Sequence, residues 1–133
     1  MIVDLEARIA RYSDDSIFNS AVGGARQNQP LGRDEDLDGT TAADLIDGEQ
    51  GDDSIEAGAG ADTVDGGAGA DEIEAGGGDD VVDGGSGSDL IDGEKGDDSI
   101  EAGAGADTVD GGAGADEIEA GGGDDVVDGG SGS

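Results

Sequence analysis

The chain has 133 residues, of which 36 are Asp or Glu and 5 are Lys or Arg, so its formal net charge is −31. This charge disfavours binding to nucleic acid, because phosphate groups would be repelled. Cys and His are absent, which excludes disulfides and thiolate or imidazole metal sites, and no apolar run is long enough to span a membrane.

The first 38 residues differ from the rest, because they contain all four Arg residues and both aromatic residues, Tyr12 and Phe18. The apolar residues of 2–12 fit a helical period and a strand period equally well. We favour a strand or hairpin, because the end of a repeat array needs a cover and Arg would neutralise its acidic rim. Residues 26–39 (RQNQPLGRDEDLDG) are predicted to form a loop. Residues 1–38 are therefore interpreted as a cap or linker.

The remaining residues, 39–133, are repetitive. The block DLIDGEQGDDSIEAGAGADTVDGGAGADEIEAGGGDDVVDGGSGS fills 44–88 and returns over 89–133 with one change, Gln50 to Lys95. Each block of 45 residues contains five units of nine. Nine complete units run over 48–128, and a degenerate unit, 39–47, precedes them. In every complete unit the first residue is Gly or Ala, the fourth Gly, the sixth Asp, the eighth Ile or Val, and the ninth Asp or Glu.

Each unit is predicted to form a turn followed by a short strand. Its Gly-rich half permits positive φ angles, and its last three residues alternate outward, inward and outward, with the branched residue inward. Two units then make one coil of 18 residues, and stacked coils form two parallel sheets around a thin Ile and Val core. The sequence predicts an all-β fold, a right-handed parallel β-roll of about five 18-residue coils with a short non-repeat N-terminal segment.

The sixth-position aspartates are the candidate metal ligands. An 18-residue coil places them in two columns, Asp44, Asp62, Asp80, Asp98 and Asp116 along one edge, and Asp53, Asp71, Asp89, Asp107 and Asp125 along the other. Neighbours in a column would lie about 5 Å apart and repel by roughly 3 kcal/mol at an effective dielectric of 20. A cation between the coils would remove this repulsion. Oxygen ligands without nitrogen or sulfur select a hard cation, and calcium suits an irregular, carbonyl-lined turn better than magnesium does.

The repeat resembles the RTX (repeats-in-toxin, haemolysin-type) calcium-binding nonapeptide, G-G-x-G-x-D-x-U-x, a known β-helix repeat. The unit GGAGADEIE (66–74) fits this pattern at every specified position. The resemblance covers about 39–133 and implies calcium between the turns of a β-roll, in a secreted bacterial protein that leaves the cell by type I export. Ala replaces the first Gly in four units and Glu49 and Glu94 replace the second, which we expect to be tolerated. The unit 39–47 lacks the fourth Gly and could leave its site incomplete.

This pattern favours some functions over others. We expect a calcium-binding structural module that is disordered without calcium, folds outside the cell around about eight calcium ions, and is not an enzyme, because the carboxylate pairs are repeated and form no single cleft. The alternative is a self-assembling fibre or scaffold subunit, or an engineered repeat. A flat surface for ice or polysaccharide fits less well, because the seventh-position residues are too mixed. A merely solvated acidic face would not require a nine-residue register. The fifth-position acids Asp52, Asp79, Asp97 and Asp124 are expected to face solvent.

The last unit stops in mid-turn, at GGSGS. An uncapped solenoid exposes core side chains and unpaired strand edges, here with Ile118 and Val127 in the last coil. We therefore expect either a fragment of a longer solenoid or end-to-end self-association in calcium through the uncapped C-terminal coil, with Asp116 as a ligand at the junction.

Overall fold

The computed structural model describes residues 26–28 and 34–132, and these residues form strands joined by turns. The strand or hairpin expected within 1–25 lies outside the described residues. In the described part of the chain no helix is long and apolar enough to cross a membrane. The strands are β1 (Arg26–Asn28), β2 (Asp36–Thr40), β3 (Leu45–Asp47), β4 (Ser54–Gly58), β5 (Thr63–Asp65), β6 (Glu72–Glu74), β7 (Val81–Asp83), β8 (Leu90–Asp92), β9 (Ser99–Glu101), β10 (Thr108–Asp110), β11 (Glu117–Glu119) and β12 (Val126–Asp128).

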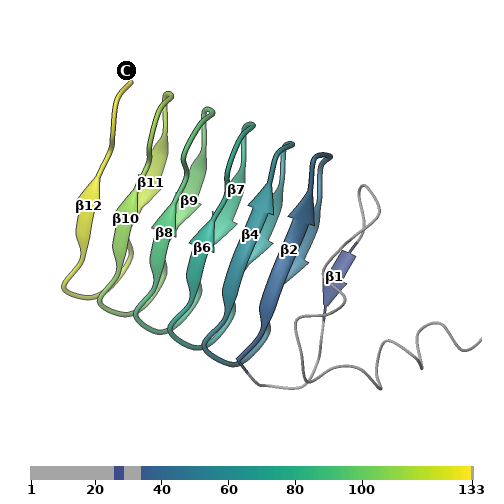
Figure 1. Ribbon diagram of the computed structural model, residues 1–133. Coiled ribbons are helices and arrows are strands. Elements are labelled where there is room, and N and C mark those ends of the chain that lie inside the picture. The colour runs from purple at the N-terminus through teal and green to yellow at the C-terminus, as the bar shows by residue number, and fades with distance from the viewer. Residues whose placement is uncertain (1–25, 29–33, 133) are drawn as a thin grey trace, which may run out of the picture.

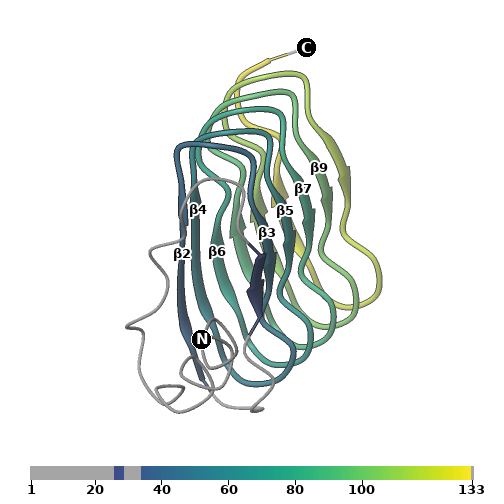
Figure 2. The same ribbon diagram turned by 90° about the vertical axis from the view of Figure 1, so that its right-hand side faces the viewer.

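The strands form two parallel sheets of six strands each (Figures 1 and 2). One sheet contains the odd-numbered strands and the other the even-numbered strands, so the chain passes from sheet to sheet at every turn. From β2 onward, each strand pairs with the strand two further along at an offset of 18 residues, as in Ile55 with Ile73 and Val64 with Val82. The prediction of an all-β solenoid of about five 18-residue coils is confirmed.

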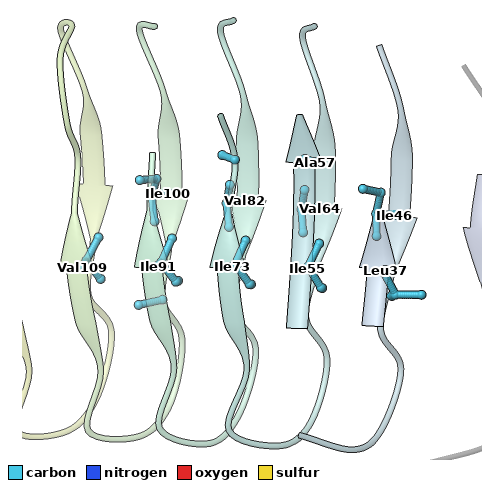
Figure 3. Close-up of a cluster of buried hydrophobic side chains, with 12 residues drawn as sticks. Leu37, Ile46, Ile55, Ala57, Val64, Ile73, Val82, Ile91, Ile100 and Val109 are labelled. Carbon is cyan, nitrogen blue, oxygen red and sulfur yellow. The ribbon is translucent and has the colours of Figure 1, made fainter. Parts of the chain in front are cut away.

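The core is a double row of branched side chains between the two sheets (Figure 3). In β6, for example, Ile73 is buried while Glu72 and Glu74 on either side are exposed, as the alternation predicts. The fully buried row comprises Leu37, Ile46, Ile55, Val64, Ile73, Val82, Ile91, Ile100 and Val109, each at most 2% exposed, together with Ala57, Ala75 and Ala102. One branched residue per nine makes this core thin. Hydrogen bonds between the main chains of successive turns therefore also hold the coils together.

The prediction of a loop over 26–39 is wrong, because β1 and most of β2 lie there. Leu37 is fully buried and pairs with Ile55, at the same 18-residue offset as the later units. The described residues 34–38 thus match the last five positions of a nine-residue unit, with Leu37 at the eighth position. Strand β1 joins the other sheet at an offset of 19, since Arg26 pairs with Leu45.

The turns favour glycine at the second position of the unit and require it at the fourth. The second-position residues have positive φ, including Glu49 at 67° and Glu94 at 62°, which occupy a left-handed conformation that glycine adopts more readily. At the fourth position, a Cβ on Gly69 or Gly78 would collide with the carbonyl oxygen of the fourth-position glycine one coil earlier. The fourth position is always Gly in the complete units because successive backbones touch there.

This close approach gives a first prediction. Gly78→Ala should destabilise the folded chain by more than the ~1–2 kcal/mol of left-handed strain, because Gly78 has φ of 141° and its new methyl group meets backbone. Gly77→Ala is the matched control, since nothing lies within 4 Å of a Cβ there and seven of the other eight complete units carry Gln, Ala, Ser or Lys at that position. Thermal unfolding in saturating calcium measures both. Equal unfolding temperatures for the two variants would contradict the packing described for this turn.

Candidate metal-binding edges

The structure places the ten predicted aspartates in two columns, one on each edge of the solenoid. The first edge carries Asp44, Asp62, Asp80, Asp98 and Asp116, and the second edge carries Asp53, Asp71, Asp89, Asp107 and Asp125. Along each edge, the N–H of one aspartate donates a hydrogen bond of 2.7–3.1 Å to Oδ1 of the aspartate 18 residues later. The carboxylates therefore link successive coils through one oxygen each.

In eight of the ten carboxylates the second oxygen has no hydrogen-bond partner. The aspartates from Asp44 to Asp107 are at most 5% exposed, while Asp116 and Asp125 are half-buried. Oδ2 is buried without a hydrogen-bond partner in Asp53, Asp62, Asp71, Asp80, Asp89, Asp98, Asp107 and Asp116. A buried polar atom without a partner is costly, and here the cost recurs in every coil. Such a regular set of buried oxygens has the chemistry to bind a cation.

The buried environment raises the pKa of these groups. Desolvation is the main cause at Asp71 and Asp80, and repulsion from the neighbouring aspartates of the column adds to it, so that the pKa of each rises from 3.8 to about 6. Burial also raises the pKa of Asp53, Asp62, Asp89 and Asp98. Without a cation, the fold thus disfavours the ionised form of its own carboxylates.

A main-chain oxygen lies beside the unpaired carboxylate oxygen in several units. A Cβ on Gly48 would be 2.7 Å from Oδ2 of Asp53 and 2.6 Å from the carbonyl oxygen of Gly66, in the next coil. Gly93 has the same surroundings, with Oδ2 of Asp98 at 2.8 Å and the carbonyl oxygen of Gly111 at 2.7 Å. Two oxygens from adjacent coils therefore converge beside the first-position glycine.

Carboxylates alone do not complete a metal site here. Among the described residues, no group of three or more Asp, Glu, His or Cys side chains is arranged to hold a metal ion. The turns supply other oxygens, because the hydrogen bonds between coils use second-, third-, sixth- and ninth-position carbonyls as acceptors, whereas first-position carbonyls face the neighbouring turn. Mixed carboxylate and carbonyl oxygens are a donor set that fits calcium.

Two sixth-position residues near the N-terminal end differ from the others. Oδ2 of Asp44 accepts hydrogen bonds from the N–H (2.6 Å) and Oγ1 (2.8 Å) of Thr40, so this oxygen already has protein donors in the degenerate unit. Glu35 occupies the sixth position of 30–38, and its N–H donates to Oδ1 of Asp53 at 2.7 Å. Glu35 is not among the predicted site residues, although its position 18 residues before Asp53 could have identified it.

The fifth-position acids serve a different purpose. Asp52, Asp79, Asp97 and Asp124 are exposed, as predicted. Oδ1 of Asp52 accepts a hydrogen bond from the N–H of Ala70 at 2.9 Å, and Oδ1 of Asp79 accepts one from the N–H of Asp97 at 3.1 Å. These side chains therefore connect the outer rims of successive turns.

The raised pKa values predict an unusual response to acid. Because the pKa of Asp71 and Asp80 is about 6 in the folded chain and 3.8 otherwise, the folded state binds more protons between these values. Its stability without calcium should therefore increase as the pH falls below about 6 and be lost again as the pH rises through 6. Far-UV circular dichroism in metal-free buffer should show more strand signal at pH 5 than at pH 8. An unchanged spectrum over this range would contradict the prediction.

The profile described as "RTX calcium-binding nonapeptide repeat (4 copies)" matches residues 32–64, 56–91, 65–100, 74–109, 83–118 and 101–133. Comparison with curated proteins and with solved structures gave no significant match. The matched residues include both edges and all the strands from β2 to β12, and they carry the acidic nonapeptide described above. The chain belongs to the RTX calcium-binding nonapeptide repeat family.

Proposed function

We propose that this chain is a structural module that folds around calcium, and that the sixth-position aspartates of both edges are its metal ligands. The observation that carries the proposal is the series of eight buried Oδ2 atoms without hydrogen-bond partners. Each of them belongs to an aspartate whose Oδ1 accepts a hydrogen bond from the adjacent coil. The same side chain would therefore bind the metal through Oδ2 and link the coils through Oδ1. The role proposed is structural rather than catalytic, because equivalent carboxylates recur evenly along both edges.

The sixth-position aspartate side chains hold the turns in register and place their carboxylate oxygens between successive coils. Oδ1 of Asp80 accepts the N–H of Asp62, and the N–H of Asp80 donates to Asp98, so Asp80 connects three coils. When bound, calcium supplies the positive charge that the buried carboxylates lack. Without it, repulsion along each column and the desolvation of the carboxylates oppose folding. The chain should therefore be disordered when calcium is scarce and fold cooperatively when it is abundant.

The proposed number of ions is about eight, one between each pair of neighbouring aspartates on an edge. Five aspartates per edge give four such pairs, from Asp44 to Asp116 and from Asp53 to Asp125. The ions would add a charge of +16 and leave about −15 from the chain's −31. The proposal extends to location outside the cell, the usual place of this family, where calcium is abundant enough to drive folding.

Equilibrium dialysis with radioactive calcium tests the proposal. Binding of about eight ions per chain, maintained in excess magnesium, is the expected result. The control variant Asp79→Asn removes one charge next to an edge without changing a proposed ligand, and should bind the same number. Binding of one or two ions, or loss of calcium to equimolar magnesium, would contradict the proposal.

A second proposed role, end-to-end self-association in calcium, is favoured by the coil formed by β11 and β12. Val127 is 46% exposed, whereas Val109, its partner in β10, is 1% exposed. Within the described residues, β11 pairs only with β9 and β12 only with β10. Sedimentation velocity in saturating calcium should show larger species as protein concentration rises, and Val127→Asp should reduce them. A monomer at all concentrations would eliminate this role.

A further inference from the structure

The first position of the nonapeptide divides the complete units into two kinds. Five units begin with glycine, and we call them Gly-first units; four begin with alanine, and we call them Ala-first units. The first-position residues are Gly48, Gly66, Gly84, Gly93 and Gly111 in the Gly-first units, and Ala57, Ala75, Ala102 and Ala120 in the Ala-first units. Both kinds keep the sixth-position Asp, so the difference lies beside the proposed ligand.

In four of the five Gly-first units, a carboxylate oxygen and a carbonyl oxygen fill the space where a first-position Cβ would be; beside Gly111 only the carboxylate oxygen does. A Cβ on Gly66 would lie 2.8 Å from Oδ2 of Asp71 and 2.9 Å from the carbonyl oxygen of Gly84. On Gly84 it would lie 2.9 Å from Oδ2 of Asp89 and 2.7 Å from the carbonyl oxygen of Ala102. A Cβ essentially never comes within 3.0 Å of such an atom. Glycine therefore leaves room for both oxygens at this position.

In the Ala-first units, a methyl group occupies that space. Ala57, Ala75 and Ala102 are fully buried. The carboxylate and the neighbouring carbonyl cannot have the positions that they have in the Gly-first units, because the methyl group would overlap both. Yet Oδ2 of Asp62, Asp80 and Asp107 is still buried without a hydrogen-bond partner. The Ala-first units thus retain a proposed ligand but hold it in different surroundings.

We propose that the chain has two classes of calcium site, and that the first-position residue sets the class. This inference rests on the proposed function. The Gly-first sites gather a carboxylate and a carbonyl oxygen closely and bind calcium more tightly. The Ala-first sites keep these oxygens farther apart, around a methyl group, and bind it more weakly.

The two classes occupy opposite halves of the two edges. Because the block of 45 residues is two and a half coils, the second copy presents its units on the other edge. The first edge has Ala57 and Ala75 in its N-terminal half, whereas the second edge has Ala102 and Ala120 in its C-terminal half. The tight sites therefore lie in the C-terminal half of the first edge and in the N-terminal half of the second edge. A coil near either end, such as 48–65 or 102–119, combines one Gly-first unit with one Ala-first unit.

Europium(III) luminescence tests this inference, because europium is a hard cation with calcium-like oxygen ligands and its excitation spectrum gives separate lines for different coordination environments. The full chain loaded with europium should give two lines. The variant Ala57→Gly, Ala75→Gly, Ala102→Gly, Ala120→Gly should lose one line and strengthen the other. The matched control changes four alanines of the third position, Ala59, Ala68, Ala104 and Ala113, to glycine and should keep both lines.

The reciprocal variant Gly93→Ala, Gly111→Ala keeps the inference testable if the fourfold first-position variant does not fold, and it should transfer intensity to the line that the fourfold variant loses. Bound europium with a single line in the wild-type chain, or two lines unaffected by the first-position changes, would overturn the two classes while leaving calcium binding intact. Absence of any bound europium and of any metal-induced strand signal would instead contradict the proposed function itself.

Discussion

A Val82→Asp substitution is expected to prevent folding even at saturating calcium. Val82 is 1% exposed and pairs with Val64 and Ile100 in the neighbouring strands. A carboxylate there would be buried among branched side chains, and an unpaired buried charge costs several kcal/mol. Each coil contributes only two branched core residues, so the surrounding packing has little stability with which to offset this cost.

The neighbouring residue provides the control for this prediction. Val81 lies in the same strand, points outward and is 52% exposed, so Val81→Asp adds the same charge to solvent. Far-UV circular dichroism in saturating calcium should show a strand spectrum for Val81→Asp and a coil spectrum for Val82→Asp. A native-like spectrum for Val82→Asp would show that the Ile and Val row does not hold the two sheets together.

Asp80→Asn should raise the calcium concentration at the folding midpoint by about tenfold or more, which corresponds to roughly 1.4 kcal/mol per tenfold change. The amide oxygen can still accept the N–H of Asp62 in place of Oδ1, so the link between coils is kept. What is lost is the buried, unpaired Oδ2 and its charge. As an interior residue of the first edge, Asp80 would contribute to the sites on both of its sides.

Two controls separate ligation from general electrostatics. Asp79→Asn changes the exposed neighbour in the same turn by the same chemistry, and its midpoint should remain close to that of the wild-type chain. Asp125→Asn changes a half-buried residue that would contribute to one site, so its effect should lie between the other two. Calcium titrations followed by circular dichroism measure all three. Equal midpoints for Asp80→Asn and Asp79→Asn would refute the assignment of the sixth-position ligands.

The periodic part of the fold could be predicted from the sequence because each nine-residue unit there forms one turn and one strand. Each predicted strand of the complete units, such as 63–65 or 72–74, is a strand in the structure, and aspartates 18 residues apart lie in one column. Leu37 was missed because Glu35 and Arg33 replace the Asp and Gly of its unit. The inward position of Leu37 is set instead by its pairing with Ile55 across an 18-residue coil.

Other features depend on backbone geometry that a repeat pattern does not specify. The sequence predicted that aspartates of one edge would be neighbours. It did not predict that Oδ1 accepts a hydrogen bond while Oδ2 has no partner, because this difference follows from the direction of the sixth-position N–H groups. The role of Thr40 at Asp44 likewise depends on the turn of one degenerate unit. The effect of a first-position methyl group on the neighbouring oxygens can be inferred only when the distance between neighbouring turns is known.

The most direct test of calcium-dependent folding is far-UV circular dichroism of the full chain at neutral pH, in excess chelator and during calcium titration. We expect a coil spectrum in chelator and a strand spectrum in saturating calcium, with a steep transition between them, because each coil supports the next. Magnesium at the same concentration should not reproduce the strand spectrum. A full strand spectrum in excess chelator at neutral pH would contradict the account, because the buried carboxylates would then need no cation.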